Sequence, residues 1–261
     1  MEILTAVLTL GFLGLIFGIG LAIASKRLAV KVDERLEKVS GLLPGANCGA
    51  CGGAGCFGFA EGLLKGDFSL DACKVSEDET KIKIAEILGQ KIEKKVKTIA
   101  TLHCAGGQKV ADRFVYDGIQ TCVSANALLG GQKSCVWGCL GFGDCAKVCP
   151  FDAISMGSDG LPTVNSNCRA CNKCVLICPK KLFSLIPVIG KVYVACSSHD
   201  SGRDTKVVCP VGCIACGLCV KACKFDAIHV VDNLAVIDYN KCSSCGDCVK
   251  VCPVHCIIQK D

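Results

Sequence analysis

The sequence predicts an α+β protein in which one N-terminal transmembrane helix precedes several small, cysteine-rich domains. Three observations lead to this prediction: an uncharged run covers residues 3–24, cysteine accounts for 25 of the 261 residues, and segments 135–179 and 213–253 repeat one cysteine motif. Aromatic residues make up only 5% of the chain, so small domains have little aromatic core to rely on. Bound metal can supply the missing folding free energy.

The uncharged run at residues 3–24 is long enough to cross a membrane. At helical rise it spans roughly 33 Å, against about 30 Å of hydrocarbon. Lys26 and Arg27 follow it, whereas the short N-terminus carries only Glu2. The positive-inside rule therefore predicts an outside N-terminus and a cytoplasmic remainder. A cleaved signal peptide is the alternative, but no basic segment precedes the run and the run exceeds the usual length.

The C-terminal cysteines have the spacing of iron–sulfur ligands. A cytoplasmic domain is kept reduced, which favours metal ligation over disulfides. In Cys242-x2-Cys245-x2-Cys248-x3-Cys252-Pro253, three cysteines can surround one [4Fe-4S] cluster while the fourth ligates a neighbouring cluster. The preceding copy matches, except that Lys224 replaces the proline. Crosswise pairing predicts one cluster on Cys213, Cys216, Cys219 and Cys252 and another on Cys223, Cys242, Cys245 and Cys248.

The middle of the chain carries an earlier pair of the same motifs. Its second half is regular, and its first half, "CVWGCLGFGDCAKVCPFDAI", is stretched by glycine-containing insertions. The same crosswise logic predicts clusters on Cys135, Cys139, Cys145 and Cys178 and on Cys149, Cys168, Cys171 and Cys174. Zinc is the alternative metal, but zinc sites usually use two C-x2-C pairs with a longer spacer.

An N-terminal cysteine group differs in its spacing. "LPGANCGACGGAGC" and a later cysteine predict a single cluster on Cys48, Cys51, Cys56 and Cys73. The glycines at positions 53, 55 and 58 formally match a dinucleotide fingerprint. We reject that interpretation because no strand precedes the glycines and a cysteine stands among them.

Five cysteines remain after these assignments. Cys104, Cys122, Cys196 and Cys209 either hold a further cluster or are small buried apolar residues, and the second interpretation is favoured. Cys256 is interpreted as a packing residue. We therefore expect five [4Fe-4S] clusters, with six as the alternative.

The formal charge of +5 treats every cysteine as neutral. Because an oxidised cluster with four thiolates carries about two negative charges, five clusters would shift the sum by about ten. We therefore predict no nucleic-acid partner.

The predicted domains are an anchor over 1–26, an iron–sulfur domain over 27–90, a connecting α/β segment over 91–134, a ferredoxin-like module over 135–181, a connecting hairpin over 182–209 and a second ferredoxin-like module over 210–261. Each module is expected to hold two clusters. Within the connections, residues 76–95 predict a helix with Ser76 as its N-cap, and residues 95–104 alternate like a strand. "LFSLIPVIGKVYVAC" predicts a hairpin with Gly190 near its turn.

These motifs together resemble a known family over nearly the whole chain. The anchor followed by "LPGANCGACGGAGC", the stretch "YDGIQTCVSANALLGGQKSCVWGCLGFGDCAKVCPFDAI" and the tandem motifs are similar to the B subunits of the Rnf complex, an ion-translocating ferredoxin:NAD oxidoreductase of bacterial membranes. The resemblance implies a redox subunit, incomplete alone as an enzyme. It would accept electrons from reduced ferredoxin and pass them to membrane partner subunits, with flavins and the NAD site on other subunits.

Under this interpretation the protein is a single-pass subunit of the bacterial cytoplasmic (inner) membrane, in contact with the lipid bilayer. The Cys48–Cys73 cluster, nearest the anchor, would deliver electrons towards the bilayer. Four lysines near the last motifs can steer an acidic ferredoxin: Lys221, Lys224, Lys241 and Lys250. The alternatives are an electron-transfer subunit of another membrane oxidoreductase or hydrogenase, a membrane-tethered redox sensor and a zinc-binding scaffold.

Overall fold

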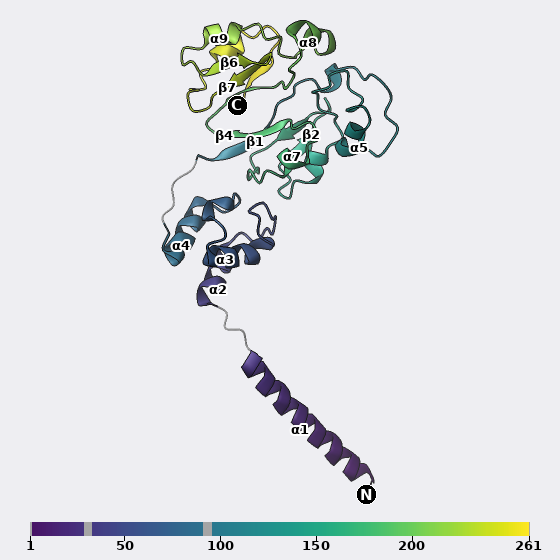
Figure 1. Ribbon diagram of the computed structural model, residues 1–261, viewed down its shortest axis with the longest axis vertical. Helices are drawn as coiled ribbons and strands as arrows, with labels where there is room; N and C mark the ends of the chain where they lie inside the picture. The colour runs from purple at the N-terminus through teal and green to yellow at the C-terminus, as the bar shows by residue number, and fades with distance from the viewer. Residues whose placement is uncertain (1, 29–32, 91–95, 261) are drawn as a thin grey trace.

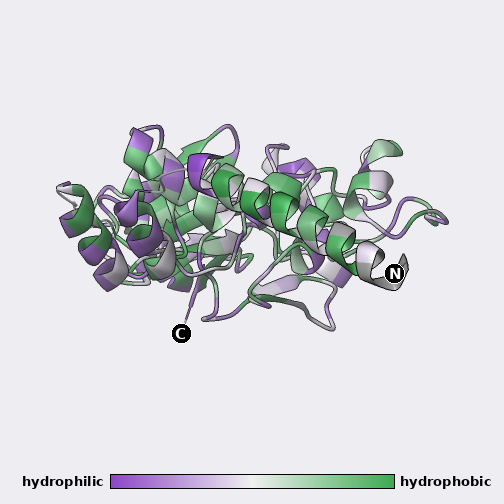
Figure 2. Ribbon diagram, turned by 90° about the horizontal axis from the view of Figure 1, so that it is seen from below, coloured by the Kyte–Doolittle hydropathy of each residue, from purple (hydrophilic) through white to green (hydrophobic). Residues whose placement is uncertain are grey.

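The computed structural model describes residues 2–28, 33–90 and 96–260. Its first element is the long helix α1 (Glu2–Leu28), which stands apart from the other elements in Figure 1. An apolar window over Leu10–Arg27 is long enough to cross a membrane, and none of that window is buried. Figure 2 shows the helix hydrophobic along most of its length and hydrophilic at the end that carries Lys26 and Arg27. The predicted anchor is therefore an exposed apolar helix.

A small helical domain follows, built from α2 (Glu34–Leu42), α3 (Gly55–Lys65), the 3-10 turn η1 (Leu70–Ala72) and α4 (Asp78–Leu88). Asp33 caps α2 by accepting a hydrogen bond from the Arg35 backbone N–H, and glycines in the left-handed region end α3 and α4. The core packs Val39 of α2 and Phe59 and Leu63 of α3 against Ile84 of α4.

The helix expected over residues 76–95 is α4, and residues 91–95 lie outside the described residues. Its N-cap is Glu77 and not Ser76 as predicted. Ser76 is buried, and its Oγ lies 3.1 Å from the Sγ of Cys73. The hydroxyl therefore serves a cysteine and is not available to the helix end.

Two units with the same order of strands and α-helices follow, and unit 1 has the 3-10 turn η2 in addition. Unit 1 runs through β1 (Thr98–Leu102), η2 (Gly107–Lys109), α5 (Cys122–Ala127), α6 (Asp144–Lys147), β2 (Ile154–Met156), β3 (Pro162–Val164), α7 (Lys173–Ile177) and β4 (Phe183–Pro187). Unit 2 runs through β5 (Val192–Val194), α8 (Gly202–Val208), α9 (Leu218–Ala222), β6 (Ile228–Val231), β7 (Leu234–Ile237), α10 (Asp247–Lys250) and β8 (Ile257–Gln259).

Each unit contains two antiparallel strand pairs. In unit 1 the first and last strands pair with Thr98 opposite Pro187, and β2 pairs with β3. In unit 2, β5 pairs with β8, placing Val192 opposite Gln259, and β6 pairs with β7. Short helices precede and follow the central hairpin in both units. The strand predicted over residues 95–104 is thus confirmed as β1.

The predicted hairpin over residues 182–209 is wrong. β4 and β5 are its two strands, but they pair with β1 and β8 and so belong to different sheets. Consequently unit 1 already begins at β1, and unit 2 begins at β5. The connecting segments expected over 91–134 and 182–209 therefore contribute strands to the units they were thought to join. Residue content predicts a strand, but it does not identify the partner strand.

Hydrogen bonds at the ends of β1 and β5 join the two units. The Nδ1 atom of His103, just after β1, lies 2.7 Å from the carbonyl oxygen of Val194 in β5, and the Oγ of Ser197 donates to the His103 carbonyl at 2.9 Å. Within unit 1, the Nε2 atom of His103 lies 2.7 Å from the Oγ of Ser184 in β4. The Nζ of Lys260 donates to the Oγ1 of Thr101 at 2.6 Å. In Figure 1, unit 2 lies at the end of the molecule opposite α1, with the helical domain between α1 and unit 1.

Candidate metal centres

The four N-terminal cysteines line one hollow beside the core of the helical domain: Cys48, Cys51, Cys56 and Cys73. Asn47 positions the loop that carries the first two. Its backbone is left-handed, with φ of 45°, and its Oδ1 accepts a hydrogen bond of 2.7 Å from the N–H of Cys56. This bond ties the loop to the first turn of α3.

Glycines in this loop allow the backbone to pack closely. A Cβ on Gly53 would lie 2.9 Å from the backbone N and Cα of Phe59, which is closer than real side-chain contacts. Gly55 has φ of +80°, and a Cβ there would lie 2.8 Å from the Oδ1 of Asn47. These steric requirements explain both glycines without a bound dinucleotide.

Two further hollows lie in unit 2. One is lined by Cys213, Cys216, Cys219 and Cys252, and the other by Cys223, Cys242, Cys245 and Cys248. The structure thus brings each predicted quartet together, including the crosswise fourth cysteine. The crossing arises because α9 and α10 pack against each other, so that the cysteine at the end of each motif faces the other loop.

A repeated turn places a backbone donor at the last cysteine of a motif. Three residues after that cysteine, φ is positive in all four motifs: Asp152, Lys181, Asp226 and His255. The next residue then donates its N–H to the sulfur, at 3.4 Å for Ala153 to Cys149, 3.5 Å for Leu182 to Cys178 and 3.4 Å for Ala227 to Cys223. Hydrogen bonds to ligand sulfurs stabilise thiolates and raise cluster potentials.

Cys256 occupies the corresponding position in the fourth motif. Its side chain is 2% exposed, and its Sγ lies 3.6 Å from the Sγ of Cys252. A hydrogen bond from the Cys256 thiol lowers the pKa of Cys213 to about 6. The same hydrogen bond raises the pKa of Cys256. Cys256 therefore lines the hollow of the Cys213 quartet as a fifth cysteine and contacts two of its members.

Unit 1 brings the second regular quartet together. Burial raises the pKa of Cys171, and the nearby sulfurs of Cys149, Cys48 and Cys168 raise it further. Burial is the main cause that raises the pKa of Cys174 to about 12, and the nearby sulfurs of Cys168 and Cys171 also raise it. These mutual effects place all four cysteines of the predicted set near one another: Cys149, Cys168, Cys171 and Cys174.

The other hollow of unit 1 differs from the predicted set of Cys135, Cys139, Cys145 and Cys178. It is lined by Cys122, Cys139, Cys145 and Cys178. The hydroxyl of Thr121 caps α5, and the N–H of Val123 donates to the Oδ2 of Asp144 at 3.2 Å, so α5 is fixed beside α6. Cys122 thereby reaches the site through contacts that its position in the sequence does not indicate.

Cys135 is held elsewhere by a strand-like contact. Arg113 N–H donates to the Gln132 carbonyl at 2.7 Å, Ser134 N–H donates to the Ala111 carbonyl at 2.9 Å, and Asp112 pairs with Lys133 as an isolated bridge. Cys135 consequently borders a separate hollow whose other cysteines are Cys104, Cys139, Cys196 and Cys209. The structure therefore places Cys122 beside Cys139, Cys145 and Cys178, where Cys135 was predicted. It places Cys135 beside Cys104, Cys196 and Cys209, where Cys122 was predicted.

The residues around these hollows suit an iron–sulfur cluster. The donors are soft cysteine sulfurs with backbone N–H groups beside them, which is the combination that such clusters use. Burial raises the pKa of Cys145 and of Cys139 to about 12, so loading must release protons from these thiols. Within residues 2–28, 33–90 and 96–260, no three His, Cys, Asp or Glu side chains converge on a single-ion position.

Comparison with known proteins agrees with this donor set. Residues 43–75 match a family model described as "Putative Fe-S cluster", and residues 212–256 match the "4Fe-4S dicluster domain". The first match covers the N-terminal quartet, and the second covers both quartets of unit 2. The fold and sites thus define a multi-cluster iron–sulfur protein in which α1 is a candidate membrane helix.

The wider relatives identify the family. The chain is 48% identical to the B subunit of the Na(+)-translocating ferredoxin:NAD(+) oxidoreductase complex of Acetobacterium woodii, over 98% of this chain and 77% of the relative. It is 40% identical to the B subunit of the ion-translocating oxidoreductase complex of Methanosarcina acetivorans, over 92% of each chain. It is also 40% identical to the B subunit of the proton-translocating ferredoxin:NAD(+) oxidoreductase complex of Clostridium ljungdahlii, over 88% of this chain and 82% of the relative. The chain belongs to the family of B subunits of ion-translocating, or Rnf, oxidoreductase complexes.

Proposed function

We propose that this chain accepts electrons from reduced ferredoxin and relays them to partner subunits in the membrane. Family membership supports a redox role, and the partners are those that the names of the relatives imply. When bound, [4Fe-4S] clusters supply one-electron oxidation and reduction. The chain itself contributes the ligands, the backbone hydrogen bonds to sulfur and the apolar surroundings that set the potential.

Four of the proposed ligand sets follow the hollows, and the third set in the list below follows the proximity of its sulfurs. The sets are Cys48, Cys51, Cys56 and Cys73; Cys122, Cys139, Cys145 and Cys178; Cys149, Cys168, Cys171 and Cys174; Cys213, Cys216, Cys219 and Cys252; and Cys223, Cys242, Cys245 and Cys248. Unit 2 matches a dicluster domain, and unit 1 repeats its order of strands and helices. We therefore propose that both units are ferredoxin-like modules with two clusters each.

The observation that carries this proposal is the proximity of sulfurs that belong to neighbouring quartets. The sulfur of Cys48 is close enough to influence the pKa of Cys171, which connects the N-terminal site to unit 1. Cys174 likewise influences Cys145, and Cys219 influences Cys248. Each pair joins two different quartets. Sites arranged in this way support electron transfer in short steps.

The exposed end of the relay is proposed to lie in unit 2. Among the 25 cysteines, all of which are described, only Cys216 and Cys245 are exposed. Exposed Leu218 and Phe225 provide apolar contact area near them, and the side chain of Lys224 is 80% exposed. An acidic ferredoxin that docks here would approach both clusters of unit 2.

The opposite end is proposed to lie at the N-terminal quartet. Its domain follows α1 directly, and Lys26 and Arg27 end that helix. The positive-inside rule then supports an outside N-terminus and cytoplasmic cluster domains. Electrons that enter at unit 2 would thus leave close to the bilayer.

An anaerobic preparation of the full chain tests this function. Mixing with reduced ferredoxin should bleach the iron–sulfur absorbance and produce the EPR signals of reduced clusters. A Cys51→Ala variant should lose one signal, that of the N-terminal cluster, and still be reduced by ferredoxin. The matched control, Gly41→Ala in α2 of the same domain, should keep all signals, because a Cβ there meets no atom within 4 Å. Zinc in place of iron, or clusters that reduced ferredoxin leaves oxidised, would refute the proposal.

A further inference from the structure

A hollow between the two units is lined by five cysteines and is not needed by the five proposed clusters. It encloses about 420 Å³ of empty space, part of it open to solvent. Cys104 lies two residues after β1, and Cys196 lies two residues after β5, so the two units contribute corresponding positions. Cys135 and Cys139 come from unit 1, and Cys209 follows α8 of unit 2.

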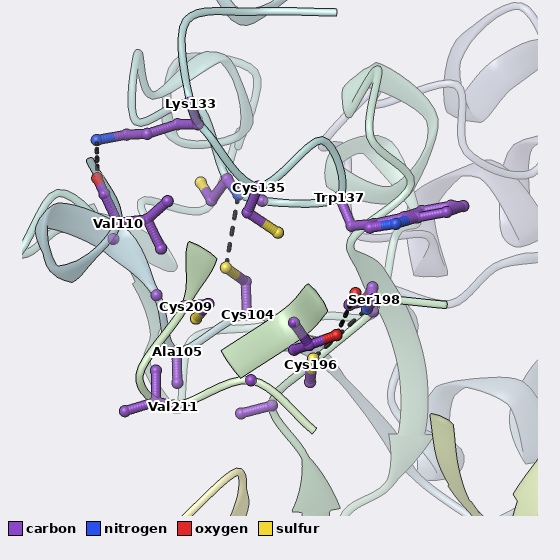
Figure 3. Close-up of a pocket in the computed structure, with 18 residues that line it drawn as sticks. Cys104, Ala105, Val110, Lys133, Cys135, Trp137, Cys196, Ser198, Cys209 and Val211 are labelled. Carbon is purple, nitrogen blue, oxygen red and sulfur yellow. Dashed lines mark hydrogen bonds between the residues drawn. The ribbon is translucent and has the colours of Figure 1, made fainter. Parts of the chain in front are cut away.

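Four of these sulfurs face one space. Figure 3 shows Cys104, Cys135, Cys196 and Cys209 around it. A Cβ on Gly106 would lie 3.6 Å from the Sγ of Cys209 and 3.8 Å from that of Cys104. A Cβ on Gly138 would lie 3.7 Å from the Sγ of Cys135. The cysteines thus converge on a cradle whose backbone is kept free of side chains.

The surroundings suit ligands that carry negative charge. The Sγ of Cys196 accepts N–H hydrogen bonds from Ser198 at 3.4 Å and from Cys213 at 3.3 Å. Lys133 also lines the hollow, but its Nζ points away from the sulfurs, towards Asp112 at 3.0 Å and the Val110 carbonyl at 3.2 Å (Figure 3). The backbone N–H donors are therefore the groups that stabilise negative charge on Cys196.

Cys139 is the fifth cysteine at this hollow, but it also lines the adjacent one. That adjacent hollow would have only three cysteines without it: Cys122, Cys145 and Cys178. Assigning Cys139 there completes one quartet and leaves a second complete quartet between the units. Cys139 remains in contact with both because its N–H lies 3.5 Å from the Sγ of Cys104.

We propose that Cys104, Cys135, Cys196 and Cys209 hold a sixth [4Fe-4S] cluster that carries electrons between unit 2 and unit 1. This inference rests on the proposed relay function. In each step, one electron leaves a reduced cluster of one unit, reduces the sixth cluster and then passes to an oxidised cluster of the other unit. No bond to a ligand forms or breaks.

Two of the hydrogen bonds to sulfur, one donated by Cys213 and one by Cys139, show how this site would bridge the units. Cys213, which donates to Cys196, belongs to a quartet of unit 2. Cys139, which donates to Cys104, belongs to a quartet of unit 1. With the site occupied, every proposed cluster has a neighbour along one continuous row from unit 2 to the N-terminal domain. Without it, the row is interrupted at the junction of the units.

Paired substitutions test both the cluster and its ligand set through iron content. The anaerobic wild-type chain should contain about 24 irons, and Cys104→Ala should contain about 20. Cys104→Ala combined with Cys135→Ala should still contain about 20, because both residues ligate one cluster. Cys104→Ala combined with Cys122→Ala should fall to about 16, because two clusters are lost. The control Val207→Ala, at an 83% exposed position of α8 outside every proposed site, should match wild type.

The outcomes that overturn the proposal are equally distinct. A wild-type content of about 20 irons that Cys104→Ala leaves unchanged would remove the sixth cluster. About 16 irons in the Cys104→Ala and Cys135→Ala variant, with about 20 in the Cys104→Ala and Cys122→Ala variant, would overturn the ligand set. Zinc bound at this site would overturn the assignment of an iron–sulfur cluster. Mössbauer spectroscopy of the wild-type chain counts clusters independently, so the test survives a variant that fails to fold.

A redox measurement separates this proposal from the relay function. After mixing with reduced ferredoxin, rapid-freeze EPR should show unit 2 reduced at the wild-type rate in the Cys104→Ala and Cys135→Ala double variant. Reduction of the N-terminal cluster should be at least about tenfold slower. Equal rates at the N-terminal cluster would refute the bridging role, whereas failure of ferredoxin to reduce unit 2 would refute the relay itself.

Discussion

Replacing Gly53 by alanine should loosen the N-terminal cluster site. The added Cβ would lie 2.9 Å from the N, Cα and Cβ atoms of Phe59. Carbon atoms in good contact are about 3.5–4.0 Å apart, so the loop must move by about 0.6 Å or more. Phe59 cannot yield easily, because its side chain is 1% exposed and its backbone lies inside α3.

The cost of this overpacking is about 1–3 kcal/mol. Each 1.4 kcal/mol corresponds to a factor of about ten, so we expect the Gly53→Ala variant to release the N-terminal cluster about 5- to 150-fold more readily. Cys51 and Cys56 flank the displaced segment, which makes this cluster the one affected. The other clusters should be unchanged.

The assay is a chelator challenge of the full chain, with loss of the N-terminal cluster followed by EPR. Its signal is identified as the one missing from Cys51→Ala. Gly41→Ala is the matched control, because Gly41 lies in α2 of the same domain and a Cβ there meets no atom within 4 Å. If Gly53→Ala and Gly41→Ala released this cluster at the wild-type rate, the steric argument would be wrong.

Two further predictions concern the docking surface and the contact between the units. A Lys224→Gln and Lys250→Gln double variant should be reduced by ferredoxin about two- to tenfold more slowly at low ionic strength, with a weaker salt dependence; an unchanged stopped-flow rate would show that these charges do not steer the donor. His103→Ala should destabilise the junction by about 1–3 kcal/mol, because the Val194 carbonyl and the Ser184 hydroxyl lose their ring partner. Hydrogen exchange should then be faster in β4 and β5 than in β6 and β7, and uniform exchange would contradict the prediction.

Local spacing was sufficient to predict which cysteines of the regular motifs gather around a common hollow. In each regular motif, left-handed residues turn the backbone between cysteines, as at Ala170, Ala215 and Ser244. A loop of this kind brings three sulfurs to one side over a few residues, so the sequence alone indicates it. The crosswise fourth cysteine could also be predicted, because the motifs occur in pairs.

The apolar anchor and the strand at β1 were predictable for the same reason. Both depend on short-range properties, namely the lack of charge over residues 3–24 and the alternation over residues 95–104. The N-cap at Ser76 was predicted wrongly, because the nearby sulfur of Cys73 takes up its hydroxyl. Even this local feature depends on a contact that the pattern does not contain.

Only the tertiary structure decided which distant segments meet. The strands on either side of Gly190 pair with β1 and β8, about 85 and 65 residues away in sequence, and not with each other. The same pairing brings the loops after β1 and β5 together and so gathers Cys104, Cys135, Cys196 and Cys209. Cys122 reaches the other hollow through the packing of α5 on α6. The sequence by itself thus determined which cysteines stand at the spacing of metal ligands. Long-range strand pairing and helix packing determined which of them share a hollow, because contacts between distant segments leave no periodic pattern in the chain.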